Sequence, residues 1–324
     1  MKNYFTLVLL LLLTLSVKAI DSKKIWYKNG QLKAEVGFEN GLFNGDFRSW
    51  YVNGQKKTEG KFFNNQRIGK WQLWDSLGTL RVVREYTDGF TFTTQLLKAV
   101  DGAELPLSVY PKYPIATNNL GEPDYPALEK HQILVFKDLW RMIDNTQENA
   151  LLFQDNTVHQ VISNYIYIEG NAVFDDYKFN HLLNVDSLRK IIRDPQMKII
   201  GYRLYEGWNY FDPYQMSDYW IMGICPIVQH TTSGQKADLG WIRFNNLRGD
   251  LEAVAVKDSG GKVMTLDELI QANAFSSTIY KEANIYDRAI ADYKKGDDII
   301  TEAYRIEFDI WDMEHEMWMR LTEE

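Results

Sequence analysis

The sequence predicts two folds in one chain: an all-β array of hairpin repeats, followed by an α+β domain with an antiparallel or mixed sheet. Two observations support this. A 24-residue repeat runs through residues 24–88, and after residue 127 helical, strand-like and again helical hydrophobic patterns follow one another. The 324 residues are 45% hydrophobic, 25% charged and 14% aromatic, which allows about two globular domains. The net charge of -8 argues against nucleic acid as a partner.

Residues 1–19 are predicted to be a secretory signal peptide. Lys2 supplies the positive start, an apolar run extends from Phe5 to Leu15, and Val17 and Ala19 place compact residues before the cleavage point. The alternative is a membrane anchor, but the run is shorter than the roughly 20 residues of a spanning helix. We expect cleavage after Ala19 and a soluble periplasmic protein with 34 basic and 44 acidic residues, a formal charge of -10.

The next region, residues 20–94, repeats itself every 24 residues. The segments that align are Trp26–Gln31, Trp50–Gln55 and Trp74–Thr79. Three further columns agree with the same spacing: Lys33, Lys57 and Arg81; Phe38, Phe62 and Tyr86; Gly45 and Gly69. Repeats of this kind stack into a sheet, and we expect the Trp and Phe columns to form its apolar ladder.

Each repeat is predicted to be a β-hairpin. Asn29-Gly30 and its counterpart one repeat later, Asn53-Gly54, are typical of type I′ turns, since both residue types tolerate a positive φ. The chain is expected to return at Gly45 and Gly69. The region 24–88 resembles variants of the MORN repeat, through its W-Y-x-N-G-Q pieces and the G-x-W or G-x-F pieces at Gly69 and Gly45. This resemblance implies scaffolding and protein contact, or contact with lipid or glycan.

A proline-rich linker is predicted over residues 95–126. It holds five of the eight prolines, namely Pro106, Pro111, Pro114, Pro123 and Pro126. Proline removes backbone donors and disfavours helix before it, so we expect an extended stretch that separates two domains.

The remaining residues, 127–324, are predicted to form the α+β domain. Helical periodicity appears over 130–147 and 179–193, and apolar runs at 197–205, 219–229, 239–244 and 251–256 predict strands. Three helices are expected to close the chain, at about 266–274, 277–294 and 298–319.

The last helix carries two apolar stripes. One is an ordinary core stripe, made of Ile299, Ala303, Ile306, Ile310, Met313 and Met317. The second is an aromatic ridge about 100–140° away, and we predict a protein interface at its residues Tyr304, Phe308, Trp311 and Trp318. The alternative is that the sheet and a neighbouring helix cover both stripes within one domain.

No catalytic, cofactor or metal motif is found, so we do not expect an enzyme. The histidines show no short ligand spacing, and adjacent helical residues such as Glu314, His315 and Glu316 diverge by 100° and cannot converge on one ion. The single cysteine, Cys225, is flanked by apolar residues and is predicted to be a buried, inert thiol.

The C-terminal region, about 127–324, resembles the GldN/PorN family of gliding motility and type IX secretion. Two segments carry the resemblance: 136–144, which reads FKDLWRMID, and 275–288, which reads FSSTIYKEANIYDR. The family implies a non-enzymatic periplasmic protein that joins an outer-membrane lipoprotein in a large oligomeric ring. It also implies contact with the periplasmic arm of an inner-membrane motor protein.

The leading hypothesis is therefore a structural ring or scaffold subunit of a type IX secretion or gliding apparatus. The repeats at 24–88 are not expected of an ordinary family member. The alternative hypothesis is an exported binding module whose MORN-like repeats recognise lipid, glycan or a protein partner.

Overall fold

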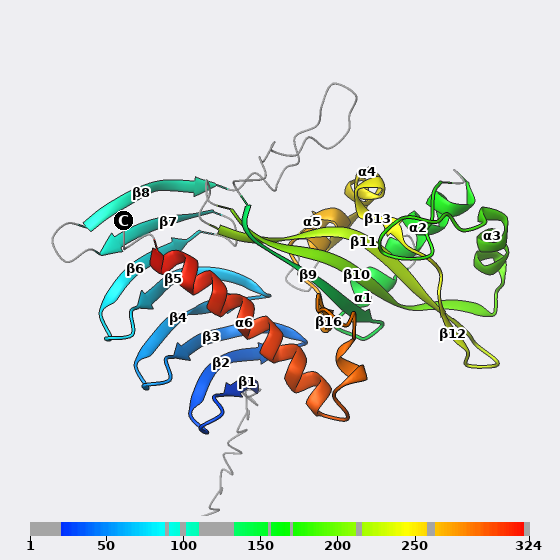
Figure 1. The fold of residues 1–324 in the computed structure, drawn as a ribbon. Helices are drawn as coiled ribbons and strands as arrows, with labels where there is room; N and C mark the ends of the chain where they lie inside the picture. Colours follow the sequence, from blue (N-terminus) through cyan, green and yellow to red (C-terminus); the bar gives the residue numbers. More distant parts are fainter. Residues whose placement is uncertain are drawn as a thin grey trace, which may run out of the picture.

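The computed structural model describes residues 21–87, 91–97, 102–109, 133–154, 157–168, 171–211, 216–257 and 263–320. The predicted signal peptide and most of the predicted linker lie outside these residues. The described chain forms two large antiparallel sheets with one long helix, α6, between them (Figure 1).

The first sheet is a meander of eight antiparallel strands in sequence order. Its strands are β1 (Asp21–Trp26), β2 (Leu32–Glu39), β3 (Leu42–Trp50), β4 (Lys56–Phe63), β5 (Gln66–Trp74), β6 (Leu80–Tyr86), β7 (Thr91–Leu97) and β8 (Gly102–Val109). The predicted hairpins are thus confirmed as a fold. The sheet continues through β7 and β8, past residue 94 where we expected the linker to begin.

The turns of the hairpins differ from the prediction. At Asn29-Gly30 only the glycine has a positive φ, of 84°, and the Gly30 N–H donates to the carbonyl of Tyr27, as in a type I turn closed by a bulge. The backbone with two positive φ values that a type I′ turn needs lies instead at Asn40-Gly41 and at the corresponding 64–65 turn. Neither turn falls at Gly45 or Gly69, which lie inside β3 and β5.

The predicted Trp ladder is also wrong. Trp26 is 59% exposed, and its equivalents Trp50 and Trp74 are only half-buried. A shift of register, typical of a bulge, occurs at each of the three and interrupts the in-and-out alternation of the strand. The column instead links repeats through its carbonyls, since the Tyr27 hydroxyl donates to Trp50 O at 2.7 Å and the Tyr51 hydroxyl to Trp74 O at 2.8 Å.

The buried ladder consists of other aromatic positions with the same spacing. Phe47 stacks on Trp71, its equivalent one repeat later, with ring centroids 5.5 Å apart. Phe62 and Tyr86 of the predicted Phe column are buried beside them. The 24-residue period therefore builds an aromatic core on one face of the sheet.

The second sheet has the order β12-β11-β10-β9-β16, all antiparallel, with β13 paired to β11. The bounds are β9 (Ile133–Asp144), β10 (Met197–Phe211), β11 (Met216–His230), β12 (Lys236–Asp238), β13 (Ile242–Arg243) and β16 (Thr278–Glu282). Two short strands, β14 (Ala255–Lys257) and β15 (Val263–Thr265), pair separately. The predicted α+β class is confirmed.

Short helices pack with this sheet around a core that includes Leu204, Ile224 and Phe244. They are α1 (Ala150–Phe153), α2 (Val158–Tyr167), α3 (Val185–Arg193), α4 (Arg248–Glu252), α5 (Leu266–Gln271) and the 3-10 helix η2 (Phe244–Asn246). A further 3-10 helix, η3 (Ile290–Asp292), packs instead in the cluster of β16 and α6. Cys225 is fully buried beside Trp140 and Trp241, and burial raises the pKa of its thiol to about 12. The predicted burial of this thiol is thus confirmed.

Two predicted helices are wrong. Within residues 130–147, Ile133–Asp144 form strand β9. Its second half is covered on both faces, so that apolar residues spaced by three or four resemble a helical stripe. Residues 277–294 contain β16 and then a turn in which the Asn284 side chain accepts backbone N–H groups that a helix would use. The segment 251–256 is only partly strand, since α4 ends at Glu252.

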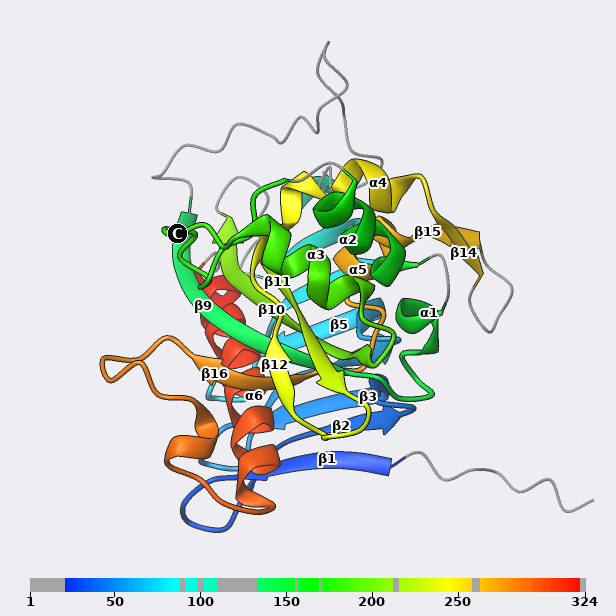
Figure 2. The ribbon, with the colours of Figure 1, turned by 90° about the vertical axis from the view of Figure 1, so that its right-hand side faces the viewer.

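The helix α6 (Asp298–Arg320) lies between the two sheets (Figures 1 and 2). One core cluster unites Leu73 of the first sheet, Leu139 of the second and Ile306 of the helix. The core stripe packs in this cluster against both sheets, whereas Tyr304, Phe308 and Trp311 pack in a second cluster, mainly with the first sheet. Both apolar stripes of α6 are thus covered within the chain, by sheets and not by a neighbouring helix.

Candidate functional site

The junction between α6 and the two sheets gathers most of the titratable side chains that are buried in the described chain. They are Lys57, Arg84, Arg141, Glu206, Asp218, Glu307, Glu314 and His315. Burial of a charge is costly unless the group is paired and hydrogen-bonded, so their contacts determine what the site does.

The aromatic ridge of α6 packs on the first sheet. Phe308 and Trp318 are each 2% exposed, whereas Tyr304 and Trp311 are half-buried. The Trp311 ring lies 5.0 Å from the Phe62 ring, centroid to centroid. The ridge thus meets a surface of its own chain, and burial leaves Phe308 and Trp318 no area for a second protein. A contact of Tyr304 or Trp311 with another protein stays a prediction.

Lysines of the repeat column hold α6 on the sheet. The Lys33 ammonium lies 2.8 Å from an Asp309 oxygen and 2.7 Å from an Asp312 oxygen. One repeat later, Lys57 lies 3.2 Å from Asp312 and 3.0 Å from Glu316. Because successive lysines meet successive turns of the helix, the repeat period sets where α6 docks.

His315 is buried between α6 and the hairpins. Its Nε2 lies 2.9 Å from the Tyr51 hydroxyl and its Nδ1 lies 2.9 Å from the Thr58 hydroxyl. Burial, and secondarily the Lys57 charge, lower the pKa of His315 to about 3. The ring is therefore neutral at neutral pH, with a hydroxyl partner on each nitrogen.

Arg67 lies where the first sheet, α6 and the second sheet meet. Its guanidinium on β5 makes a two-pronged ion pair with Glu314 on α6, and Ser217 of β11 donates to the same carboxylate at 2.8 Å. It also lies over the Trp71 and Trp318 rings, 5.1 and 5.3 Å from their centroids. Burial alone would lower the pKa of Arg67, but Glu314 raises it above the ordinary value.

A second buried network lies on the side of the second sheet. Arg141 of β9 lies 2.7 Å from a Glu206 oxygen and 2.9 Å from a Glu307 oxygen, and the Tyr219 hydroxyl donates to Glu307 at 2.9 Å. Burial would lower the pKa of Arg141, but Glu307 and Glu206 raise it. Burial and Glu307 together raise the pKa of Tyr219 well above its ordinary value.

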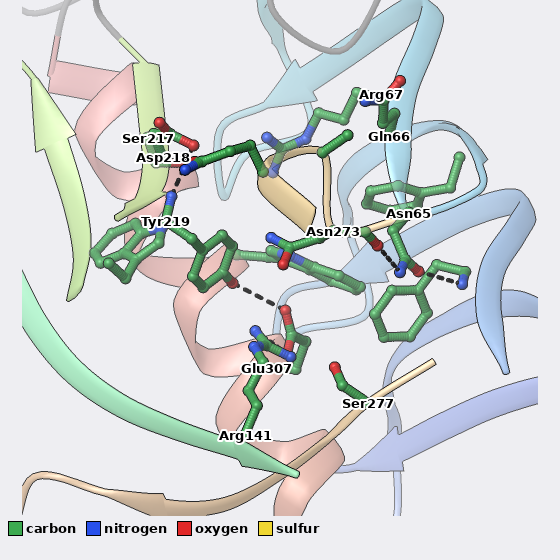
Figure 3. Close-up of a pocket in the computed structure, with 16 residues that line it drawn as sticks. Asn65, Gln66, Arg67, Arg141, Ser217, Asp218, Tyr219, Asn273, Ser277 and Glu307 are labelled. Carbon is green, nitrogen blue, oxygen red and sulfur yellow. Dashed lines mark hydrogen bonds and ion pairs between the residues drawn. The ribbon is translucent and has the colours of Figure 1, made fainter. Parts of the chain in front are cut away.

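A cavity of about 110 Å³ lies between these networks (Figure 3). Asn65, at the β4–β5 turn, lines it and donates to the Asn273 carbonyl at 2.7 Å, which ties the hairpins to the end of α5. The cavity is smaller than the roughly 300–1,000 Å³ of typical ligand pockets. The Arg67 Nε and Asn273 Oδ1 atoms at this cavity lack protein partners, which suits ordered water.

The charged side chains of the junction form ion pairs with one another. Glu314, His315 and Glu316 point to three different partners, as their helical spacing predicts. In the described ranges no group of three His, Cys, Asp or Glu side chains could hold a metal ion. The arrangement joins the layers by charge pairing and aromatic packing.

Sequence reasoning identified Lys33 and Lys57 only as a repeat column, without their partners on α6. It did not single out Arg67 or Arg141. The available signal was the row of acidic residues on the last helix, Asp309, Asp312 and Glu316, whose spacing of three and four residues places them on one face.

The fold and the junction define an α+β protein in which a C-terminal helix is shared between a repeat sheet and a second domain. Residues 128–319 match the family described as gliding motility associated protein GldN. This span is more than half of the chain, and the chain belongs to that family. No protein of curated function matches the chain.

The matched span contains α6 but begins after the first sheet. Membership of the hairpins in the MORN repeats stays a prediction. None of the helices in the described residues is long and apolar enough to cross a membrane.

Proposed function

We propose that this gliding motility associated protein is a non-enzymatic structural subunit of a type IX secretion or gliding apparatus. It would act in the periplasm, after removal of the predicted signal peptide at 1–19, as part of a ring or scaffold. The partners we propose are an outer-membrane lipoprotein and the periplasmic arm of an inner-membrane motor protein.

The observation that carries the proposal is the family match over residues 128–319. The junction supports the proposal, because its buried charged groups form ion pairs that hold α6 on the two sheets. Examples are Arg67 with Glu314 and Arg141 with Glu307. A subunit that transmits or bears load needs its parts fixed to one another.

The sharing of α6 also bears on the role of the hairpins. Lys33 and Lys57 bind the helix, and the aromatic face of the sheet is covered by it. Lipid or glycan recognition by that face would require α6 to leave. We therefore propose that the hairpins extend the surface of the subunit and contact other proteins through their opposite face.

Deletion of the gene in its native host tests the proposal. We expect loss of gliding or of type IX secretion, restored by the full chain. Affinity purification of the tagged chain, followed by mass spectrometry, should recover an outer-membrane lipoprotein as the main partner. A deletion strain that glides and secretes normally would overturn the assignment.

A further inference from the structure

The face of the first sheet that points away from α6 carries three tryptophans of the repeat. Figure 1 shows α6 against the other face of this sheet. Trp26, Trp50 and Trp74 each follow a buried residue of the same strand, so their side chains point to the outer face. None of the three belongs to a core cluster of the described residues. Aromatic side chains that the core does not use are typical of binding surfaces.

Smaller side chains alternate with these tryptophans across the sheet. They are Leu32, Lys56 and Leu80, the strand partners of Trp26, Trp50 and Trp74. The Lys56 ammonium lies 4.9 Å from the centroid of the Trp74 ring, whereas the next residue, Lys57, pairs with α6 on the other face. We call these six residues the tryptophan row. Along the row, each large ring stands between smaller neighbours, so that ridges and grooves alternate.

The period of the tryptophan row matches one conformation of a peptide. Neighbouring strands are about 4.8 Å apart, so tryptophans two strands apart repeat about every 9.6 Å. A polyproline II helix has three residues per turn and a rise of about 3.1 Å per residue, which gives about 9.3 Å per turn. Successive turns of such a helix can therefore meet successive tryptophans.

The tryptophan row also offers the chemistry that a proline-rich segment needs. A polyproline II helix has no internal hydrogen bonds, so its backbone carbonyls are free to accept them. Tryptophan combines an apolar ring face with an N–H donor at its edge. Grooves lined by aromatic side chains are the usual receptors of proline-rich segments in other folds.

The charges beside the tryptophan row favour an uncharged ligand. Lys56 lies 2.7 Å from Glu59, and Arg48 lies 3.3 Å from Glu59 and 3.5 Å from Glu35. Because these two cations and two carboxylates already pair with one another, they offer little attraction to the phosphate groups of nucleic acid or lipid. A proline-rich segment with few charges suits such a surface.

We infer that the tryptophan row binds a proline-rich segment of a partner protein in the polyproline II conformation. The segment would lie across the strands, with one turn at each tryptophan. The inference deepens the proposed function, because it rests on protein contact through the outer face of the hairpins and names the chemistry of the partner.

Isothermal titration calorimetry of the full mature chain with nonaproline, a short polyproline II peptide, tests this inference. We expect saturable binding. Trp50→Ala, at the centre of the row, should raise the dissociation constant about tenfold or more. Trp26→Ala, at the edge strand, should raise it by a smaller factor, and its 59% exposed side chain can be removed without loss of the fold. A glycine-serine peptide of the same length should not bind.

Phe63→Ala is the matched control for the two tryptophan variants. Phe63 is also aromatic and is 55% exposed, but it lies at the far end of β4, outside the row, so this variant should bind nonaproline like the unchanged chain. Circular dichroism verifies the fold of each protein. Chitohexaose, a β-1,4-linked sugar chain, is titrated in parallel, because sugar rings also stack on tryptophan.

Three results would overturn the inference. They are the absence of nonaproline binding, binding of chitohexaose in its place, and equal affinity of the unchanged chain and a folded tryptophan variant. Each of them leaves the deletion phenotype, and thus the proposed ring or scaffold role, to be judged separately.

Discussion

The two sheets of this molecule reach their cores by different routes. In the first sheet every strand pairs with its neighbours in sequence, yet its aromatic face is covered by a helix more than 200 residues further along. In the second sheet, β16 pairs with β9 across more than 130 residues, and the short helices between the strands pack with the sheet. A repeat array can thus be regular in its strands and still depend on a distant, non-repeated element for its core.

The largest expected effect comes from separating α6 from the first sheet. Replacing both Trp311 and Trp318 by Ala should lower the free energy of unfolding by about 5 kcal/mol or more, since Trp318 is buried and Trp311 packs on Phe62. Urea unfolding measures the change. Trp26→Ala, at a 59% exposed tryptophan of the repeat, should change it by at most about 0.5 kcal/mol. Equal losses in both proteins would contradict the shared core.

The next effect comes from the buried ion pair that joins the layers. Glu314→Leu should cost about 3–5 kcal/mol in the free energy of unfolding, because it leaves the Arg67 charge buried without its partner. The double variant Arg67→Met with Glu314→Leu should recover most of this loss. A double-mutant cycle by urea unfolding measures the coupling, and additive losses would show that the two side chains act independently.

A tight contact inside the repeat sheet should have a smaller effect. A Cβ atom added at Gly60 would lie 2.2 Å from Cδ2 of Trp71, which is 1% exposed and has no room to move. Gly60→Ala should therefore cost about 1–3 kcal/mol. Gly249→Ala is the control, since nothing lies within 4 Å of its added Cβ atom. Thermal unfolding compares the two, and an unchanged melting temperature for Gly60→Ala would refute the close packing.

The pH dependence of stability sharpens the comparison further. The pKa of His315 is about 3 in the folded chain against the ordinary 6.5, so the unfolded chain binds a proton that the folded chain excludes. Stability from this group is complete above pH 6.5 and is lost as pH falls toward 3, about 2 kcal/mol between pH 7 and 5. Urea unfolding across that range should show a shallower slope for His315→Gln.

The sequence predicted the parts of the fold that local pattern decides. The 24-residue period located the hairpins, and the spacing of Ala303, Ile306 and Ile310 located α6. The prediction failed at β9, where burial of both faces in the second half of the strand removes the alternation that identifies a strand. It also failed at 277–294, where the turn at Asn284 interrupts a helical pattern.

At the junction, the sequence identified some of the residues that take part but did not identify the residues that they contact. The aromatic ridge was recognised on α6, and the lysine column was recognised in the repeats. That Lys33 meets Asp309 follows from neither pattern alone, because it depends on how two segments 276 residues apart pack together. Arg67 and Arg141 gave no periodic signal, since each serves a single tertiary network.

The position of α6 at the far end of the chain affects how the protein is made. A ribosome that adds about 5–20 residues per second needs about 10–40 s to proceed from the last hairpin strand to the helix. During that interval the hairpin segment lacks the helix that covers its aromatic face, so it cannot complete its core and has to stay unfolded or shielded, as the proposed export also requires. A chain cut short before residue 298 would keep that face uncovered, and quality-control proteases would have a means to distinguish unfinished copies from complete ones.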